Sequence, residues 1–140
     1  MKAFKTKKDA DDFAASAWAA EHQARYREKA GGDPAMGQFE VPEFPTDASP
    51  TPFLQLSTLV LDEENKHGEA RKAWMDVVQL LGKETFGGKS LGDGPPVGLG
   101  MIGWNSLEEA GEAFKNSEVA ASWTTYKSLG KGKNIMIRHL

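Results

Sequence analysis

The sequence contains no cysteine and only three histidines. Without cysteine there is neither a disulfide nor a thiolate ligand for a metal, which is typical of a reducing compartment. The histidines are scattered and have no carboxylate pair beside them, so no metal site is predicted. The formal net charge is −3, and lysines are interspersed with acids, which excludes the basic stripe of a nucleic-acid-binding protein.

Long hydrophobic runs are also missing. No segment reaches the roughly 20 apolar residues of a membrane span. Near the N-terminus, Lys7 and Lys8 are followed by Asp9, Asp11 and Asp12 and not by the apolar segment of a signal peptide. We therefore expect a soluble, cytoplasmic protein of 140 residues with no membrane or nucleic-acid partner and a single core.

The most informative part of the sequence lies between residues 94 and 117. Residues 97–104 are an apolar run broken by three glycines, which predicts a buried strand that something bulky approaches closely. Ser106 and Glu109 have the spacing of a capping box, in which each side chain bonds a free backbone N–H at the start of a helix. A helix is therefore expected to begin at about Leu107.

The other elements follow from periodicity and from glycine and proline positions. Apolar residues at helical spacing predict helices over 6–30 and from about residue 66 to Gly82, and the helix from Leu107 is expected to break near Asn116, with a new cap at Ser117. Alternation predicts strands over 53–61 and 134–140, and segment 84–93 is expected to pair with 97–104. Gly130 and Gly132 are interpreted as the end of the last helix.

Five of the seven prolines lie between residues 33 and 52, which predicts an extended arm. We expect residues 1–52 to form an N-terminal helix and this arm, and residues 53–140 to form the main domain. Its order of strand, helix, strand, strand, helix, strand predicts an α+β, ferredoxin-like βαββαβ fold with both helices on one face of a four-stranded sheet. The opposite face is also apolar, so a face-to-face homodimer is expected.

These residues also carry a family resemblance. The run GMIGWNSLEEAGEAFKNSE, preceded by FLQLSTLVL and a tryptophan-containing helix and followed by NIMIRHL, resembles the dimeric α/β barrel superfamily. Within it, the sequence is similar to the antibiotic biosynthesis monooxygenase type, especially its small fungal members. The resemblance implies a homodimer with a ligand cavity between sheet and helices in each subunit. Such proteins include cofactor-independent monooxygenases, polyketide cyclases, haem-degrading enzymes and proteins without a known reaction.

Two positions can be compared with the pattern of this family. Trp104 matches its tryptophan at the end of the third strand. The histidines that many members carry on the second helix are absent, because Ala110, Gly111 and Ala113 occupy that region. This departure argues against haem degradation, and no cofactor is expected.

The expected binding site lies beside the glycine-rich strand. Gly98 and Gly100 share a face with Trp104, and the missing side chains leave room for a flat ligand to stack on the indole. Gln55 and Ser57 are polar residues on a buried strand face and need partners there. With Arg138, which together with Gln55 could donate to a carbonyl or enolate oxygen, they complete the predicted substrate-binding residues.

Three residues are candidates for proton transfer: His139, Tyr126 and His67. A neutral histidine is a suitable base for removing a proton next to a ketone, and His67 lies in the first turn of its helix, where the dipole disfavours the charged imidazole. Each candidate also has an ordinary structural interpretation. His139 would be solvent-exposed near the last residue, His67 exposed on its helix, and Tyr126 a helix anchor. Among the binding residues, Arg138 would be part of a surface ion pair.

Two functions of different classes fit this sequence. The first is a cofactor-independent enzyme of secondary metabolism that cyclises, isomerises or oxygenates a polyketide-like or aromatic intermediate through an enolate. The alternative is a non-catalytic, dimeric ligand-binding or stress-response-type barrel protein. In either case we expect a hydrophobic small-molecule ligand, and we hypothesise that the N-terminal helix and arm close the cavity or strap the dimer.

Overall fold

The structure, a computed structural model, describes residues 3–33, 37–42, 51–83, 85–91 and 95–138. The chain divides into two units, Met1–Gln38 and Phe39–Leu140. No helix in the described ranges is both long enough and apolar enough to cross a membrane.

The first unit contains two helices where the sequence predicted one. Helices α1 (Lys7–Ala14) and α2 (Ala17–Ala30) are separated at Ser16, which has an extended backbone and accepts a hydrogen bond from the Ala19 N–H. The single helix expected over 6–30 is therefore wrong at this point, because the serine starts a new helix instead of continuing the first. Gly31 ends α2 in the left-handed conformation, with φ of 72°.

The second unit is an α+β structure with a five-stranded antiparallel sheet in the order β1-β3-β4-β2-β5. Its elements, in chain order, are β1 (Phe39–Glu40), β2 (Phe53–Leu61), the short helix η1 (Glu64–Lys66), α3 (His67–Leu81), β3 (Thr85–Ser90), β4 (Val97–Trp104), α4 (Leu107–Lys115), α5 (Ser117–Ser128) and β5 (Gly130–Arg138). The predicted ferredoxin-like arrangement is confirmed. The sheet has one strand more than expected because β1 pairs with the outer edge of β3.

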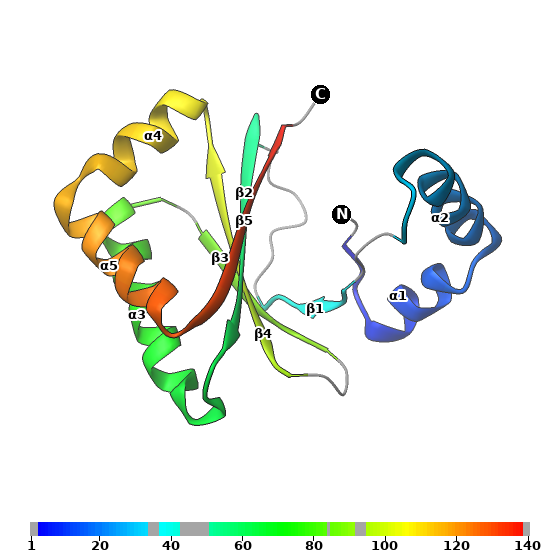
Figure 1. Cartoon of the computed structure of the whole chain (residues 1–140), viewed down its shortest axis with the longest axis horizontal. Coiled ribbons are helices and arrows are strands. Elements are labelled where there is room, and N and C mark those ends of the chain that lie inside the picture. The colour runs from blue at the N-terminus through cyan, green and yellow to red at the C-terminus, as the bar shows by residue number, and fades with distance from the viewer. Residues whose placement is uncertain (1–2, 34–36, 43–50, 84, 92–94, 139–140) are drawn as a thin grey trace. The chain divides into compact units, whose positions relative to one another are not determined.

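Helices α3, α4 and α5 all lie on one face of the sheet (Figure 1). Alternation along β2 turns Gln55, Ser57 and Leu59 toward these helices, and all three side chains are buried. Residues opposite one another in an antiparallel pair share a face, so Met136 of β5 and Ile102 of β4, the two partners of Gln55, also face the helices.

The core under α3 is filled by aromatic side chains. Trp74 packs against both hydrophobic clusters of the unit and is therefore a core residue. Its indole lies directly over Gly100, where a Cβ atom would be 2.3 Å from the Trp74 ring. Only glycine leaves space for this contact, so Gly100 and Trp74 form one packing unit.

Strand β5 begins earlier than the sequence indicated. It starts at Gly130 and not at Asn134, so Gly130 and Gly132 belong to the strand and are not helix-ending residues. A Cβ atom at Gly130 would lie 2.0 Å from the carbonyl oxygen of Val60. Close approach of β5 to β2 thus explains the glycine, which local helix-stop rules misinterpret.

The predicted break between the last two helices is confirmed at Asn116. Asn116 is itself the N-cap of α5, and its side-chain oxygen accepts hydrogen bonds from the Glu118 and Val119 N–H groups. Ser117, the expected cap, is the first residue of the helix.

Candidate ligand-binding cleft

A cleft of about 560 Å³ lies between α4, α5 and β5, with Gln55 of β2 at its wall. Its lining is mostly apolar and carries a few polar groups. The residues that line it are Gln55, Ala110, Gly111, Phe114, Ala120, Trp123, Thr124, Lys127, Asn134, Ile135 and Met136. A volume of this size, walled by aromatic and aliphatic side chains, suits a small organic molecule.

The cleft exists because the helices present short side chains at this point. Ala110, Gly111 and Ala120 line it, and a Cβ atom at Gly111 would meet no atom within 4 Å. Strand β5 pairs with β2 alone within the described residues, so the sheet ends beside these small residues. The space is therefore left open instead of being filled by a side chain from a further strand.

Gln55 is the buried polar group of this wall. It is 6% exposed, and its Oε1 accepts a 2.9 Å hydrogen bond from Nε1 of Trp104, which is 0% exposed. An indole N–H can only donate, so the amide oxygen must face Trp104. The amide NH₂ is then the part of Gln55 that a ligand can use, and it can only donate.

Trp104 contacts the cleft through Gln55 and is otherwise enclosed. The Lys83 ammonium lies 4.6 Å from the centroid of its ring, and the Phe114 ring lies at 6.0 Å on a tilted plane. The space over Gly100, where the sequence predicts room for a ligand, is occupied by Trp74. The aromatic walls of the cleft are Phe114 and Trp123 instead.

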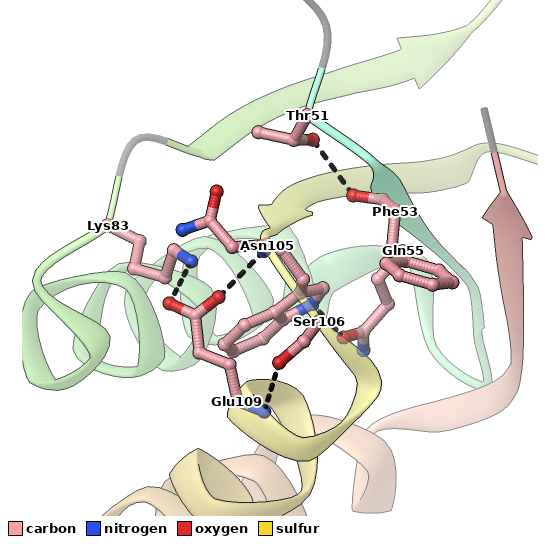
Figure 2. Close-up of polar contacts among 8 residues, drawn as sticks. Thr51, Phe53, Gln55, Lys83, Asn105, Ser106 and Glu109 are labelled. Atoms are coloured by element: carbon pink, nitrogen blue, oxygen red, sulfur yellow. Dashed lines mark hydrogen bonds and ion pairs between the residues drawn. The ribbon is translucent and has the colours of Figure 1, made fainter. Parts of the chain in front are cut away.

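The start of α4 is held by a network at this same corner. Ser106 accepts a hydrogen bond from the Glu109 N–H at 3.0 Å, which confirms the predicted capping box. The Glu109 carboxylate bonds Nζ of Lys83 at 2.5 Å and the backbone N–H of Asn105 at 2.7 Å, one residue before the expected partner (Figure 2). These hydrogen bonds lower the pKa of Glu109, and the bond from Lys83 has the largest effect.

Tyr126 and Ser57 form a second buried polar pair. Both are nearly inaccessible, and burial raises the pKa of Tyr126, while a hydrogen bond with the Ser57 side chain works against this by stabilising the phenolate. The Tyr126 ring lies between Trp74 and Trp123, with centroid distances of 5.6 and 5.5 Å. Tyr126 is therefore a neutral phenol behind the cleft wall at physiological pH, which does not suit a base.

The remaining predicted residues lie elsewhere. His67 is the first residue of α3, as expected, and is exposed. Arg138 is exposed on β5, two residues beyond Met136 and on the same face. Gly98 lies over the Leu59 carbonyl, where a Cβ atom would make an ordinary 3.7 Å contact. His139 lies outside the described residues.

Several lining residues were missed by the sequence analysis. Ala120, Trp123, Thr124 and Lys127 recur at helical spacing, which marks one face of a helix but not what that face meets. Asn134 was treated as the first residue of a strand, without a role. The pairing of β5 with β2 places Asn134 opposite Ser57, two residues along β2 from Gln55, and no local signal encodes this register.

Across the described ranges, no group of three or more histidine, aspartate or glutamate side chains is placed to hold a metal ion. Lys127 is the one charged side chain among the described residues that line the cleft. The arrangement therefore provides an apolar slot with amide donors and one cation.

Neither a protein-family model nor a curated protein matches the sequence. Solved structures do match. SnoaB, a cofactor-independent oxygenase from Streptomyces nogalater, superposes with a TM-score of 0.51 at 8% identity over 63% of this chain and 92% of that chain. A mutant of SnoaB gives 0.52 at 6% identity, over 62% and 91% of the two chains.

A conserved protein of unknown function from Bacteroides thetaiotaomicron superposes with a TM-score of 0.52 at 14% identity, over 64% of this chain and 99% of that chain. At these identities the likeness concerns the fold alone. The similarity to small fungal members stays a prediction. The expected resemblance is confirmed at the level of fold: the chain is similar in structure to ferredoxin-like proteins of the antibiotic biosynthesis monooxygenase type, such as SnoaB.

Proposed function

We propose that the protein is a cofactor-independent enzyme of secondary metabolism that acts on a polyketide-like or aromatic molecule in the cleft. The observation that carries this proposal is the Gln55 amide, which lines a largely apolar cleft while Trp104 holds its oxygen at 2.9 Å. A buried donor that is held in one orientation before the ligand arrives is what stabilisation of a developing oxyanion requires.

The chemistry follows from this donor. A flat ketone lies against Phe114 and Trp123, whose rings pack edge to face with centroids 5.4 Å apart, and its oxygen accepts a hydrogen bond from the Gln55 NH₂. When a proton leaves the carbon activated by the ketone, the electron pair moves toward that oxygen, and the hydrogen bond strengthens in the apolar surroundings. The resulting enolate is reactive toward dioxygen, toward a second carbonyl, or toward a proton at another carbon, which gives oxygenation, cyclisation or isomerisation.

The reaction also requires a base that removes the proton. No imidazole or carboxylate is among the described residues of the cleft lining, and Tyr126 has a raised pKa. His139 follows Arg138 directly in the sequence and remains our predicted base, while exposed His67 is a weaker candidate. Loss of turnover in His139→Ala, with ligand binding retained, is the result expected for the base.

The proposal is tested with anthrone, a flat aromatic ketone with an acidic CH₂ group. Oxygenation converts anthrone and dioxygen to anthraquinone and water, so both oxygen uptake and absorbance report it. Gln55→Glu still accepts the Trp104 hydrogen bond but brings negative charge to the enolate oxygen. We expect it to lower kcat by about 10²-fold or more, as for other lost oxyanion donors.

Thr58→Val is the matched control, because Thr58 lies on the same strand but on the opposite sheet face. It should leave turnover unchanged. Equal rates in Gln55→Glu and the wild type would show that the Gln55 amide has no role in the reaction. Oxygen uptake with anthraquinone formation separates the oxygenase from a cyclase or isomerase.

A second candidate function is non-catalytic ligand binding. It is favoured by the absence of an imidazole or a carboxylate among the described residues of the lining. Saturable binding of anthrone without any product, in the wild type as in Gln55→Glu, would support it. Turnover that is lost in a single-residue variant would exclude it.

We also propose that two copies associate through the sheet face opposite the helices. On this face Leu54 pairs with Ile137 and Leu56 with Ile135, which is 58% exposed. Contiguous apolar side chains at such exposure are typical of a contact surface. Sedimentation should show a dimer that Ile135→Lys dissociates, and a wild-type monomer at high concentration would contradict it.

A further inference from the structure

We propose that the ligand of the cleft carries an ionised acidic group, which Lys127 and Asn134 bind at the end of the cleft away from Gln55. This inference rests on the proposed function, because it specifies the substrate class of the same site: a flat apolar body with an anionic substituent such as a carboxylate.

The charge of the cleft is the first observation. Lys127 lines it, and no carboxylate is found among the described lining residues. Lys127 also has no ion pair within the described part of the chain, whereas Lys115, at the equivalent end of α4, pairs with Glu112 at 2.6 Å. An unpaired ammonium at the wall of an apolar cleft favours a negatively charged ligand.

The hydrogen-bonding capacity at this end points the same way. The Thr124 hydroxyl donates to the Ala120 carbonyl at 2.9 Å, so its proton is already used. Lys127 can supply three donors, and the Asn134 amide can supply two. Neither side chain has a hydrogen bond to another described residue, so both are available to donate to an anionic oxygen.

The sheet register places this group apart from the amide of Gln55. Met136 lies opposite Gln55, while Asn134 lies opposite Ser57, one pleat closer to the start of β5. That start follows directly on the end of α5, where Lys127 lies. A ligand with its acidic group at Lys127 and Asn134 would extend along Trp123 toward Gln55, so that the anion fixes which carbonyl meets the donor.

The test compares 2-naphthoate with 2-naphthamide, which share a ring system and differ in charge. Binding to the full chain is followed at low ionic strength by calorimetry and by quenching of tryptophan fluorescence. We expect the wild type to prefer the carboxylate by about three- to tenfold, a range typical of a partly exposed charged pair. Lys127→Gln should remove this preference, while Lys115→Gln, which changes the same charge at the end of α4, should retain it.

Two further outcomes separate this proposal from the function of the cleft. If the wild type binds both probes with equal affinity and the cleft-filling variant Gly111→Phe abolishes this binding, the proposed acidic group of the ligand is refuted. The cleft itself would still be a binding site. Failure of both probes to bind, or binding that Gly111→Phe does not affect, would overturn both. Equal losses in Lys127→Gln and Lys115→Gln would also contradict the proposal, because the effect would then be general charge.

Discussion

The helix layer of the second unit has two halves, which differ in whether the small residues lie on the strands or on the helices. Under α3, the glycines are on the strands, and Trp74 lies over both Gly87 and Gly100. Beside β5, the small residues are on the helices, at Gly111 and Ala120, and the edge strand leaves them uncovered. The first half is a packed core and the second is a cleft.

The difference teaches that a glycine-rich strand does not by itself indicate a ligand site. A missing side chain leaves room, but an aromatic residue from the neighbouring helix can take it, as Trp74 does. An opening survives where the facing element is an edge strand, because no further strand brings a side chain to it. The sequence predicts the space at Gly100, and the structure places it at Gly111.

The largest effect on stability is expected from Gly100→Ala, which disturbs the packed core under α3. The added methyl group would lie 2.3 Å from the rigid indole of Trp74, so the helix or the strand must move. We expect a loss of roughly 1–3 kcal/mol in the free energy of unfolding, as for overpacked cores. Urea denaturation followed by tryptophan fluorescence measures it.

Gly98→Ala is the control on the same strand and face. Its methyl group would make an ordinary 3.7 Å contact with the Leu59 carbonyl. Its unfolding free energy should stay within about 0.5 kcal/mol of the wild type. Equal costs at the two glycines would mean that Trp74 does not define the packing of this half.

A smaller effect is expected at the boundary between the halves, where Tyr126 contacts both Trp74 and Trp123. Tyr126→Phe leaves the buried Ser57 hydroxyl without this partner, which should cost about 1 kcal/mol at neutral pH. The pH dependence has a definite sign. Since burial raises the pKa of Tyr126, the folded state holds the phenol proton more strongly than the unfolded chain, whose pKa is about 10.

The stability from the neutral phenol is therefore complete below about pH 10 and decreases as the pH rises toward the folded pKa. The difference in unfolding free energy between the wild type and Tyr126→Phe should shrink over this range. Tyr26→Phe, which makes the same substitution at the exposed tyrosine of the first unit, is the control variant. A constant difference up to pH 11 would contradict the assignment.

The smallest effect is expected in the open half, from Gly111→Ala. The methyl group meets no atom within 4 Å, and alanine favours a helix over glycine. We expect a gain of about 0.5–1 kcal/mol in the free energy of unfolding, measured as above. A loss of stability would show that this part of α4 is packed and not open.

The features that the sequence predicted well are encoded over a few neighbouring residues. The capping box of Ser106 and Glu109, the break at Asn116 and the alternation of β2 all depend on residues close in the chain. The same dependence on neighbouring residues explains the wrong prediction at Gly130. A glycine after a helix is a local stop signal, but this glycine is required because a Cβ atom would clash with the Val60 carbonyl.

The candidate site was less predictable for the same physical reason. Gln55 could be singled out as a polar residue on a buried strand, and the structure gives it Trp104 as a partner. No comparable sequence signal singles out Lys127 and Asn134, since a lysine near a helix end and an asparagine in an exposed strand are both common. Gln55 reaches the same cleft as these two residues through the pairing of β5 with β2, which joins parts of the chain about 75 residues apart, and pairings of this kind leave no pattern in a short window.

The pairing of β5 with β2 also determines at which stage of synthesis the cleft can form. Strand β5 follows every other described element in the chain, yet it completes the sheet beside β2, the first long strand. Chains emerge from the ribosome N-terminal end first. The edge of β2 that pairs with β5 is therefore unpaired while α3, β3, β4, α4 and α5 are synthesised. A nascent chain that stops short of β5 has no wall opposite α5, so the proposed ligand binding requires that synthesis has passed this strand.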